Sequence, residues 1–476
     1  MAVADEDRQP DTADAVARRQ PGPRSKRPRA GRPRLRESLV ARVPRLLRET
    51  QFRRYWTGQT VSMFGDQISG IAIPLAAVLV LHADAAEMGY LTALVWLPSL
   101  LFGLHAGAWV DRRGQRRVIM IAADLARFAL LASLPLSYAL GVLTLAQLFV
   151  IAFAVGALSV VFNVSNTALF VTVVPEERYL EGNSLLYSSR AMSFVTGPSI
   201  GGLLVQALSA PFAIAADALS FLGSAFFLHR IRPAEPPPDR SGKGAVTAGA
   251  RFIAGSPIVR ASLLGVSVIN FFNLMFSALF LLFAVRVLHV NAGEIGLILG
   301  LAAAGGVVGA ALTRRIADRI GVGWAYTLGC LGFTAPTMLV PLASGPRPLV
   351  LSMLFAAEFL SDFGVMVLDI SIGSIFAAVI PADLRSRVSG AFQAVNYGTR
   401  PVGALLGGLL GTLIGLRPAL WIASAGGVLG FLLLIPSPLP AFRMQSPDGK
   451  QRPLAAPELD VPQPEVPQPG LPQAGE

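Results

Sequence analysis

Three acidic residues lie in a stretch of sequence that is otherwise apolar and long enough to cross a membrane. Glu358, Asp362 and Asp369 are separated by four and seven residues, which places them on one face of a helix. An ionisable group at the centre of a membrane helix costs about 2.5–3.5 kcal/mol on insertion scales, so this face should meet a cavity or a partner helix. Glu358 and Asp362 are like charges one turn apart, and we expect one of them to hold a proton, as a proton-coupling group does. Asp369 lies nearer the helix end and is expected to belong to a gate.

Other ionisable residues in apolar stretches are candidates for the same chemistry. Asp66, beside Gln67, is expected either to carry a proton or contact a cationic substrate, or else to make a structural hydrogen bond to a neighbouring helix end. Arg400 is the expected counter-charge for the acidic face. Arg190 precedes a Gly-Pro pair and is a candidate member of a proton relay.

Three more charged residues are expected to serve structure first. Asp124 and Arg127 are three residues apart and should pair with each other on one helix, although Arg127 is also an alternative to Arg190 in the relay. Asp217 is expected to pack helices together or to form part of an outer gate.

The composition indicates that membrane helices position these residues. Of 476 residues, 53% are hydrophobic and only 14% are charged, with a mean hydropathy of +0.57. Soluble domains carry roughly a quarter charged residues, so a soluble enzyme is excluded. At about 20 residues per span, the sequence predicts an all-α membrane protein with twelve transmembrane helices in two pseudo-symmetric six-helix bundles. The predicted spans are 58–80, 88–110, 118–140, 144–173, 183–206, 211–230, 258–284, 293–312, 322–343, 348–379, 389–414 and 418–436.

The flanking segments complete the predicted organisation. Residues 1–50 read as a disordered basic cytoplasmic arm, 51–230 as the first bundle, 231–257 as a cytoplasmic linker, 258–436 as the second bundle and 437–476 as a disordered Pro-rich tail.

Basic residues alternate between the predicted loops and so indicate an orientation. One set of loops holds fifteen arginines and lysines and the other holds three, which by the positive-inside rule puts both termini in the cytoplasm. The three are Arg286, Arg347 and Arg417. The fifteen are Arg112, Arg113, Arg116, Arg117, Arg178, Arg230, Arg232, Arg240, Lys243, Arg251, Arg314, Arg315, Arg319, Arg385 and Arg387.

The two halves of the chain repeat each other. The segment 111–114, Asp-Arg-Arg-Gly, recurs at 318–321 as Asp-Arg-Ile-Gly, an offset of 207. The segment 201–204, Gly-Gly-Leu-Leu, recurs at 407–410, an offset of 206. Parallel six-helix repeats are the layout of transporters in which two bundles rock about a midplane site.

On these residues the chain resembles the major facilitator superfamily over about 51–436. The loop after the second span is similar to that superfamily's G-x-x-x-D-R-x-G-R-[RK] signature, with Gln115 in place of the usual arginine. The resemblance implies a conformational latch in which Asp111 pairs with loop arginines or a helix end in one state only, and in which Gly107 permits close helix approach. The expected latch residues are Gly107, Asp111, Arg112, Gly114, Arg116, Asp318 and Arg319.

The fifth span is similar to the helix motif of proton-antiporting exporters in that superfamily. It contains Gly197, Pro198, Gly201 and Gly202, which would bend the helix and pack it tightly. A kinked, closely packed helix without an antiport role is the alternative. The start of the first span resembles the drug and macrolide efflux branch, which includes siderophore exporters.

These features together predict a secondary transporter in a bacterial plasma membrane, exporting amphipathic small molecules by proton-coupled alternating access. The alternatives are a dedicated exporter of one metabolite or siderophore, an importer, and a non-transporting membrane sensor. An enzyme is not expected, because no H-E-x-x-H, G-x-S-x-G or P-loop pattern is present. The expected partners are a small-molecule substrate, protons and the lipid bilayer, with no nucleic acid, no cofactor and no metal, in a monomer.

Overall fold

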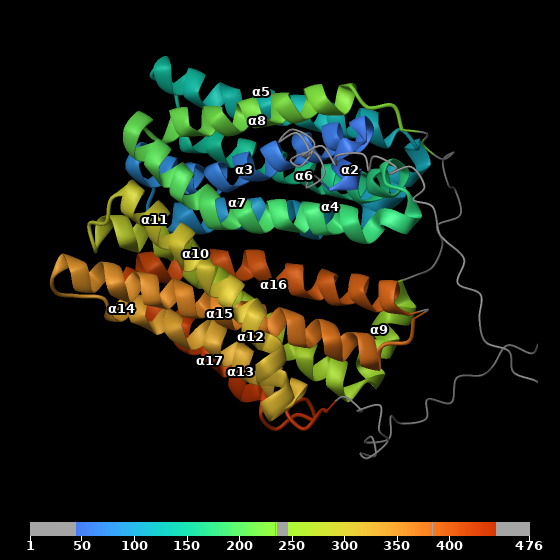
Figure 1. Cartoon of the computed structure of the whole chain (residues 1–476). Helices are drawn as coiled ribbons and strands as arrows, with labels where there is room; N and C mark the ends of the chain where they lie inside the picture. The colour runs from blue at the N-terminus through green and yellow to red at the C-terminus, as the bar shows by residue number, and fades with distance from the viewer. Residues whose placement is uncertain (1–43, 234, 236–245, 383, 444–476) are drawn as a thin grey trace, which may run out of the picture.

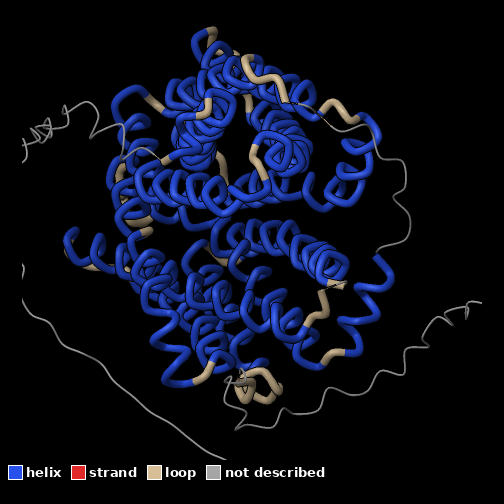
Figure 2. Tube along the Cα trace, turned by 45° about the vertical axis from the view of Figure 1, so that its right-hand side comes forward, coloured by secondary structure: helices blue, strands red, loops and turns tan. Residues whose placement is uncertain are grey.

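The computed structural model describes residues 44–233, 235, 246–382 and 384–443. Residues 1–43 of the expected disordered arm 1–50, residues 444–476 of the expected tail 437–476, and residues 234 and 236–245 of the linker lie outside the described residues. The part of the chain that is described consists of helices and loops, with no strand (Figure 2).

The described residues form twelve long helical segments in two stacked bundles, which confirms the predicted fold class (Figure 1). Within this part of the chain, eleven segments are long and apolar enough to cross a membrane by length and composition, and α16 completes the second bundle. The first bundle comprises α3 (Thr50–Leu79), α4 (Ala85–Arg113), α5 (Arg116–Ala139), α6 (Leu145–Val173), α7 (Tyr179–Leu208) and α8 (Ala210–His229). The second comprises α10 (Pro257–Arg286), α11 (Ala292–Ala302) with α12 (Ala304–Ile320), α13 (Val322–Thr334) with η2 (Ala335–Met338) and α14 (Leu339–Leu342), α15 (Arg347–Val379), α16 (Arg385–Leu413) and α17 (Leu416–Leu434).

Among the described residues, three short helices lie in segments that the sequence predicted to be a disordered arm, a loop between spans or a linker. Helix α2 (Arg45–Arg48) precedes α3, and the backbone N–H of its buried Leu46 donates to Glu181 at 3.0 Å. A turn of 3₁₀ helix, η1 (Glu176–Arg178), precedes α7, and α9 (Val246–Gly255) packs against α16. Residues 44–50 therefore differ from the expected disordered arm, because their apolar side chains pack onto the first bundle.

The helical break in the eighth span was not predicted. Helices α11 and α12 meet at Ala303, and Gly305 and Gly306 follow directly. A Cβ at Gly305 would overlap the carbonyl of Phe359 on α15. The glycine therefore lets the bent segment lie against the helix that carries the acidic face.

The predicted repeat extends to the backbone conformation of the loops. Asp84 and Asn291 cap α4 and α11, each in a capping box with the glutamate three residues later. These caps are 207 residues apart, the offset already seen in the loop motifs. Gly114 and Gly321, at the same offset, both adopt positive φ, 64° and 89°, where a glycine is favoured. The two halves are thus built on one pattern.

Two glycine contacts hold the bundles together at the end opposite the basic loops. Gly89 in the second turn of α4 meets Gly408 near the end of α16, and a Cβ at Gly89 would lie 2.8 Å from the Cα of Gly408. Gly202 of α7 meets Gly296 of α11 in the same way, with 2.6 Å from a Cβ on Gly202 to the Cα of Gly296. Helix α7 packs against α11, and α4 packs against α16. The bundles are closed at this end.

The glycines toward the basic end of α4 and α16 make no such contact. A Cβ added at Gly103 or Gly107 of α4, or at Gly390 of α16, would meet no atom of the described residues within 4 Å. The close helix approach expected at Gly107 is therefore wrong for this conformation, because no described atom of a neighbouring helix lies next to that position.

Candidate functional site

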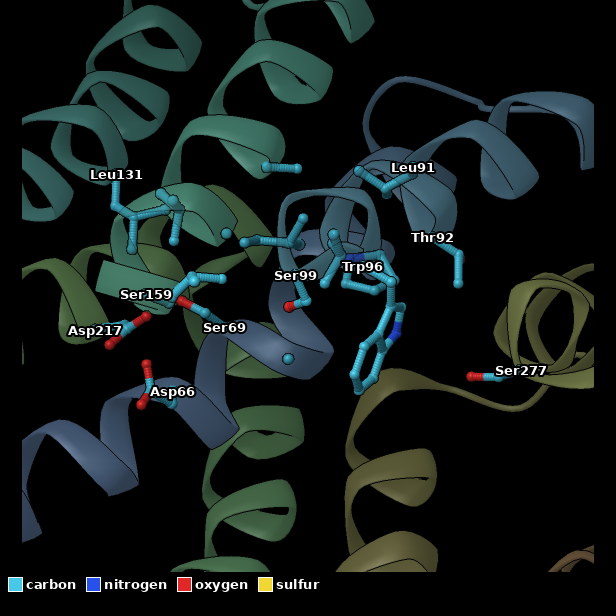
Figure 3. Close-up of a pocket in the computed structure, with 18 of the residues that line it drawn as sticks. Asp66, Ser69, Leu91, Thr92, Trp96, Ser99, Leu131, Ser159, Asp217 and Ser277 are labelled. Carbon is cyan, nitrogen blue, oxygen red and sulfur yellow. The ribbon is translucent and has the colours of Figure 1, made fainter. Parts of the chain in front are cut away.

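A cavity of about 400 Å³ lies within the first bundle and reaches α10 of the second (Figure 3). Helices α3, α4, α5, α6 and α8 form most of its wall, and Ser277 and Leu281 of α10 complete it. Its described lining contains no lysine, arginine or histidine. The polar lining side chains are those of Asp66, Ser69, Thr92, Ser99, Ser159, Asn163, Asp217 and Ser277, beside Trp96.

Asp66 and Asp217 face each other at one side of this cavity. Figure 3 shows the two carboxylates pointing toward one another, with Ser69 beside them. Asp66 is exposed to the cavity, whereas Asp217 is only 1% exposed and accepts a hydrogen bond from the Ser220 hydroxyl at 3.0 Å. The cavity thus holds two carboxyl groups of different accessibility.

Gly65 allows this approach of α3 and α8. A Cβ at Gly65 would overlap the Asp217 carboxylate and the Ser220 hydroxyl. The absence of a side chain therefore brings the two helices together at the level of the two acids. Asp66 fits the predicted proton or substrate contact in position, since it lines a cavity.

Asp217 has a position that the sequence predicted only in part. It lies buried in the packing of α8 against α3, as predicted, and it also lines the cavity opposite Asp66, which was not predicted. The residues are 151 positions apart, and only the pairing of α3 with α8 joins them. The sequence signal for Asp217 was the free-energy cost of an aspartate in an apolar span, and this cost does not indicate which other residue the aspartate meets.

Asp124 and Arg127 form the expected ion pair, buried on α5 beside the cavity. The guanidinium of Arg127 lies between the rings of Phe162 and Phe221, 4.3 and 4.1 Å from their centroids. It also donates to the hydroxyl of the cavity residue Ser159 at 3.4 Å. The pair therefore connects α5, α6 and α8 next to the two cavity carboxyls.

Replacing Arg127 by alanine is expected to destabilise the protein by about 3–5 kcal/mol, because Asp124 would be left as an unpaired buried charge. The measurement is the thermal unfolding of the purified protein in detergent. The control is the double variant Asp124→Leu with Arg127→Met, which should recover most of the lost stability because it removes both charges. Equal stability of Arg127→Ala and wild type would contradict a structural role for the pair.

The acidic face of α15 lies outside this cavity. Glu358 and Asp362 are half-buried and Asp369 is exposed, and none lines the cavity. Among the described residues none of the three makes an ion pair, although Arg400 on α16 acts electrostatically on Asp369. The expected ion pairing of Arg400 with this face is therefore absent from the described residues in this conformation.

Arg400 instead contacts aromatic rings at the boundary between the bundles. Its guanidinium lies 4.2 Å from the centroid of Trp96 on α4 and 4.7 Å from that of Tyr397 on its own helix. Trp96 lines the cavity, so this contact links the cavity wall of the first bundle to α16 of the second. These cation–π contacts offset part of the free-energy cost of placing an arginine in a membrane-spanning helix.

Arg190 is separate from the main cavity. It lines a smaller cavity of about 260 Å³ between α3, α6 and α7, together with Tyr55 and Asn166. The Tyr55 hydroxyl donates to the Asn166 side chain at 2.6 Å. The structure therefore does not bring Arg190 to Asp66, as a direct relay between them would require.

The loop with the latch residues makes one of the expected contacts. Asp111 lies 3.4 Å from Arg116. Glu235, which the sequence analysis did not single out, accepts hydrogen bonds from the backbone N–H groups of Arg116 and Arg117 at 2.6 and 3.0 Å. This carboxylate caps the start of α5 and ties the linker to the loop.

The remaining latch residues are exposed at the basic end. Asp318 is 3.8 Å from Arg314, while Arg112 and Arg319 are exposed. Gly114 ends α4 with a left-handed backbone conformation. The second copy of the latch thus forms a weak surface pair rather than a contact between the bundles.

The glycines of the predicted antiporter motif pack α7 between two neighbours. A Cβ at Gly197 would overlap the Gln67 side chain, and one at Gly201 would lie 3.1 Å from the Cα of Ile68, both on α3. Gly202 faces α11 of the other bundle, and the Pro198 carbonyl lies against Gly296 there. The motif therefore connects the helix of Asp66 to the contact between the bundles.

Two pseudo-symmetric six-helix bundles that meet closely at one end, with a polar cavity in the first bundle that reaches the second, define a multi-pass membrane protein of the transporter class. The sequence pattern of the Major Facilitator Superfamily matches residues 55–397 and, in an overlapping match, 263–466. The chain belongs to the Major Facilitator Superfamily.

Named relatives include both uncharacterised transporters and multidrug pumps. The "uncharacterized MFS-type transporter YfiS" of Bacillus subtilis is 26% identical over 378 residues, covering 76% of this chain and 87% of the relative. The "multidrug efflux pump Tap" of Mycobacterium tuberculosis is 27% identical over 383 residues, covering 74% and 85%.

Solved structures share the fold at lower identity. A bacterial homologue of the iron transporter ferroportin in an inward-facing state has a TM-score of 0.66 at 17% identity, covering 83% of this chain and 99% of that one. A bacterial homologue of the lysosomal transporter Spinster, inward-facing and occupied, has a TM-score of 0.64 at 13% identity, covering 81% and 96%.

Proposed function

We propose that the protein is a proton-coupled exporter of amphipathic small molecules in a bacterial plasma membrane. The observation that carries the proposal is the cavity with Asp66 and Asp217 on its wall, in a transporter that is closed at one end. A carboxyl group that faces such a cavity can take up a proton in one conformation and release it in another. The multidrug efflux relatives support export as the direction.

In this proposal the basic end faces the cytoplasm, with both termini on that side. The positive-inside rule supports this orientation, since fifteen of eighteen loop arginines and lysines belong to that end. The conformation would then be inward-facing. Export would proceed when the bundles separate at the Gly89 and Gly202 contacts and close at the basic end, where Asp111 and its loop would hold the second state.

The charge of the cavity favours cationic or neutral cargo over anions. Two carboxyls face it and its described lining has no basic side chain. Trp96 and the apolar wall formed by Leu91, Val95 and Leu131 would contact the apolar part of such a molecule. The protein would act on this small-molecule substrate and on protons within the bilayer, as a monomer and without nucleic acid.

A dedicated exporter of one metabolite or siderophore is the second candidate, because the relatives differ from this chain over nearly three quarters of the aligned positions. The test is efflux from proteoliposomes of a panel of cationic dyes, macrolides and siderophores under an imposed pH gradient. We expect several cationic compounds to move faster with the gradient than without it. Movement of one compound class alone would favour the dedicated exporter, and transport indifferent to the gradient would contradict proton coupling. No transport of any compound would favour a membrane sensor.

A further inference from the structure

We propose that Asp66 and Asp217 hold a single proton between them, which makes Asp217 a second proton-carrying residue of this site. The role of this proton in transport rests on the proposed function. The shared proton itself does not, because it belongs to the protein without substrate. Two observations carry it. The carboxylates face each other across the α3–α8 contact (Figure 3), and the interior around them holds an excess of acid.

The charges around the pair can be listed helix by helix. Helix α3 contributes Asp66, α8 contributes Asp217, and α5 contributes Asp124 and Arg127. The cavity residues of α4, α6 and α10 are neutral. The described residues on these helices therefore place three carboxyl groups and one guanidinium here, and Arg127 is already bound to Asp124.

This balance leaves Asp66 and Asp217 without a cation of their own, because the one guanidinium is paired with Asp124. Two ionised carboxylates that face each other in a protein interior repel strongly, and a proton shared between them removes that repulsion. A second proton is not needed, because Asp66 is exposed to the cavity and Arg127, although paired with Asp124, also acts electrostatically on both acids. The buried Asp217, whose Oδ1 accepts from Ser220, keeps an oxygen for the hydrogen bond with its partner.

The proton can leave by a simple route. When the O–H bond breaks, the proton goes to a water molecule in the cavity and the bonding electron pair stays on the oxygen that held it. Both groups are then carboxylates, and no other bond has changed. A monocation that enters the cavity would then replace the positive charge of the released proton beside the two carboxylates. The pair would exchange one proton for one positive charge.

The test uses infrared difference spectroscopy of the full-length protein without substrate, near neutral pH. The wild type should show a carbonyl band of a protonated carboxyl group that disappears in both Asp66→Asn and Asp217→Asn. Either asparagine amide donates a hydrogen bond to the remaining carboxylate and favours its ionised form. Asp217→Glu keeps a carboxyl group at this position and should keep the band. Glu358→Gln, on α15 outside the cavity, measures the contribution of a carboxyl that does not belong to the pair.

A band lost in only one of the two asparagine variants, or in neither, would overturn the shared proton. If Asp217→Asn does not fold, Gly65→Ala separates the two carboxyls without removing either, and an unchanged band in that variant would overturn the proposal equally. The infrared result is independent of transport. A shared band together with transport that ignores the pH gradient would retain the pair and reject the proton-coupled function.

Discussion

Replacing Asp66 by asparagine is expected to abolish the part of substrate efflux that responds to a pH gradient. Asparagine has nearly the same shape and fits the same cavity wall, but it cannot bind or release a proton. Downhill exchange of substrate should continue, because the helices and the cavity remain. The measurement is efflux from proteoliposomes with and without an imposed gradient, at equal amounts of reconstituted protein.

Asp362→Asn is the matched control for this result. It makes the same chemical change in an apolar helix of the other bundle, away from the cavity. Gradient-driven efflux should persist in it. The opposite pattern, with efflux retained in Asp66→Asn and lost in Asp362→Asn, would move the coupling site to the acidic face of α15.

Replacing Gly89 by valine is expected to open the end of the transporter that is closed here. A Cβ at this position would lie 2.8 Å from both the Ala404 carbonyl oxygen and the Gly408 Cα, and valine adds two methyl groups beyond it. Overpacking of this kind costs about 1–3 kcal/mol. Since 1.4 kcal/mol is a factor of ten in an equilibrium, the population of the closed state relative to the open one should fall by a factor of about 5 to 140.

The accessibility of a cysteine at Thr92 in the cavity measures this shift. With Cys330 replaced by alanine, a membrane-impermeant maleimide should label Thr92→Cys faster from the side opposite the basic loops once Gly89→Val is added. Transport should slow because one of the two alternating states is disfavoured. Gly103→Val on the same helix is the matched control, since a Cβ there meets nothing within 4 Å among the described residues, and it should change neither labelling nor transport. Equal effects of the two valines would refute a specific contact at Gly89.

The sequence alone predicted much of the architecture, because the properties involved are local. The length of each apolar stretch reports a membrane span, and an offset of 206 or 207 between motifs reports the repeat. The structure places helix ends within a few residues of most predicted spans. Larger differences arise where a helix continues into polar sequence, as α3 does from Gly58 back to Thr50.

The candidate site could be predicted only in part. Asp66 was identified because placing a carboxyl group in an apolar span costs free energy, which a functional or structural role must offset. Glu358 and Asp362 were identified on the same ground. The cost of a charge in an apolar span does not determine which acids share a cavity. Asp217 was assigned to packing, and the structure adds its place opposite Asp66, while Arg400 was assigned to the acidic face and lies over Trp96 instead.

The sequence by itself therefore determined the number of spans, the two-fold repeat and which ionisable residues lie in apolar spans, where they cost free energy. The tertiary structure decided which of those residues meet. Asp66 and Asp217 come together because Gly65 lets α3 and α8 touch, and the bundles close at one end because Gly89 meets Gly408 and Gly202 meets Gly296. Such contacts join residues far apart in the chain through the packing of whole helices, and no local pattern of hydrophobicity or charge contains them.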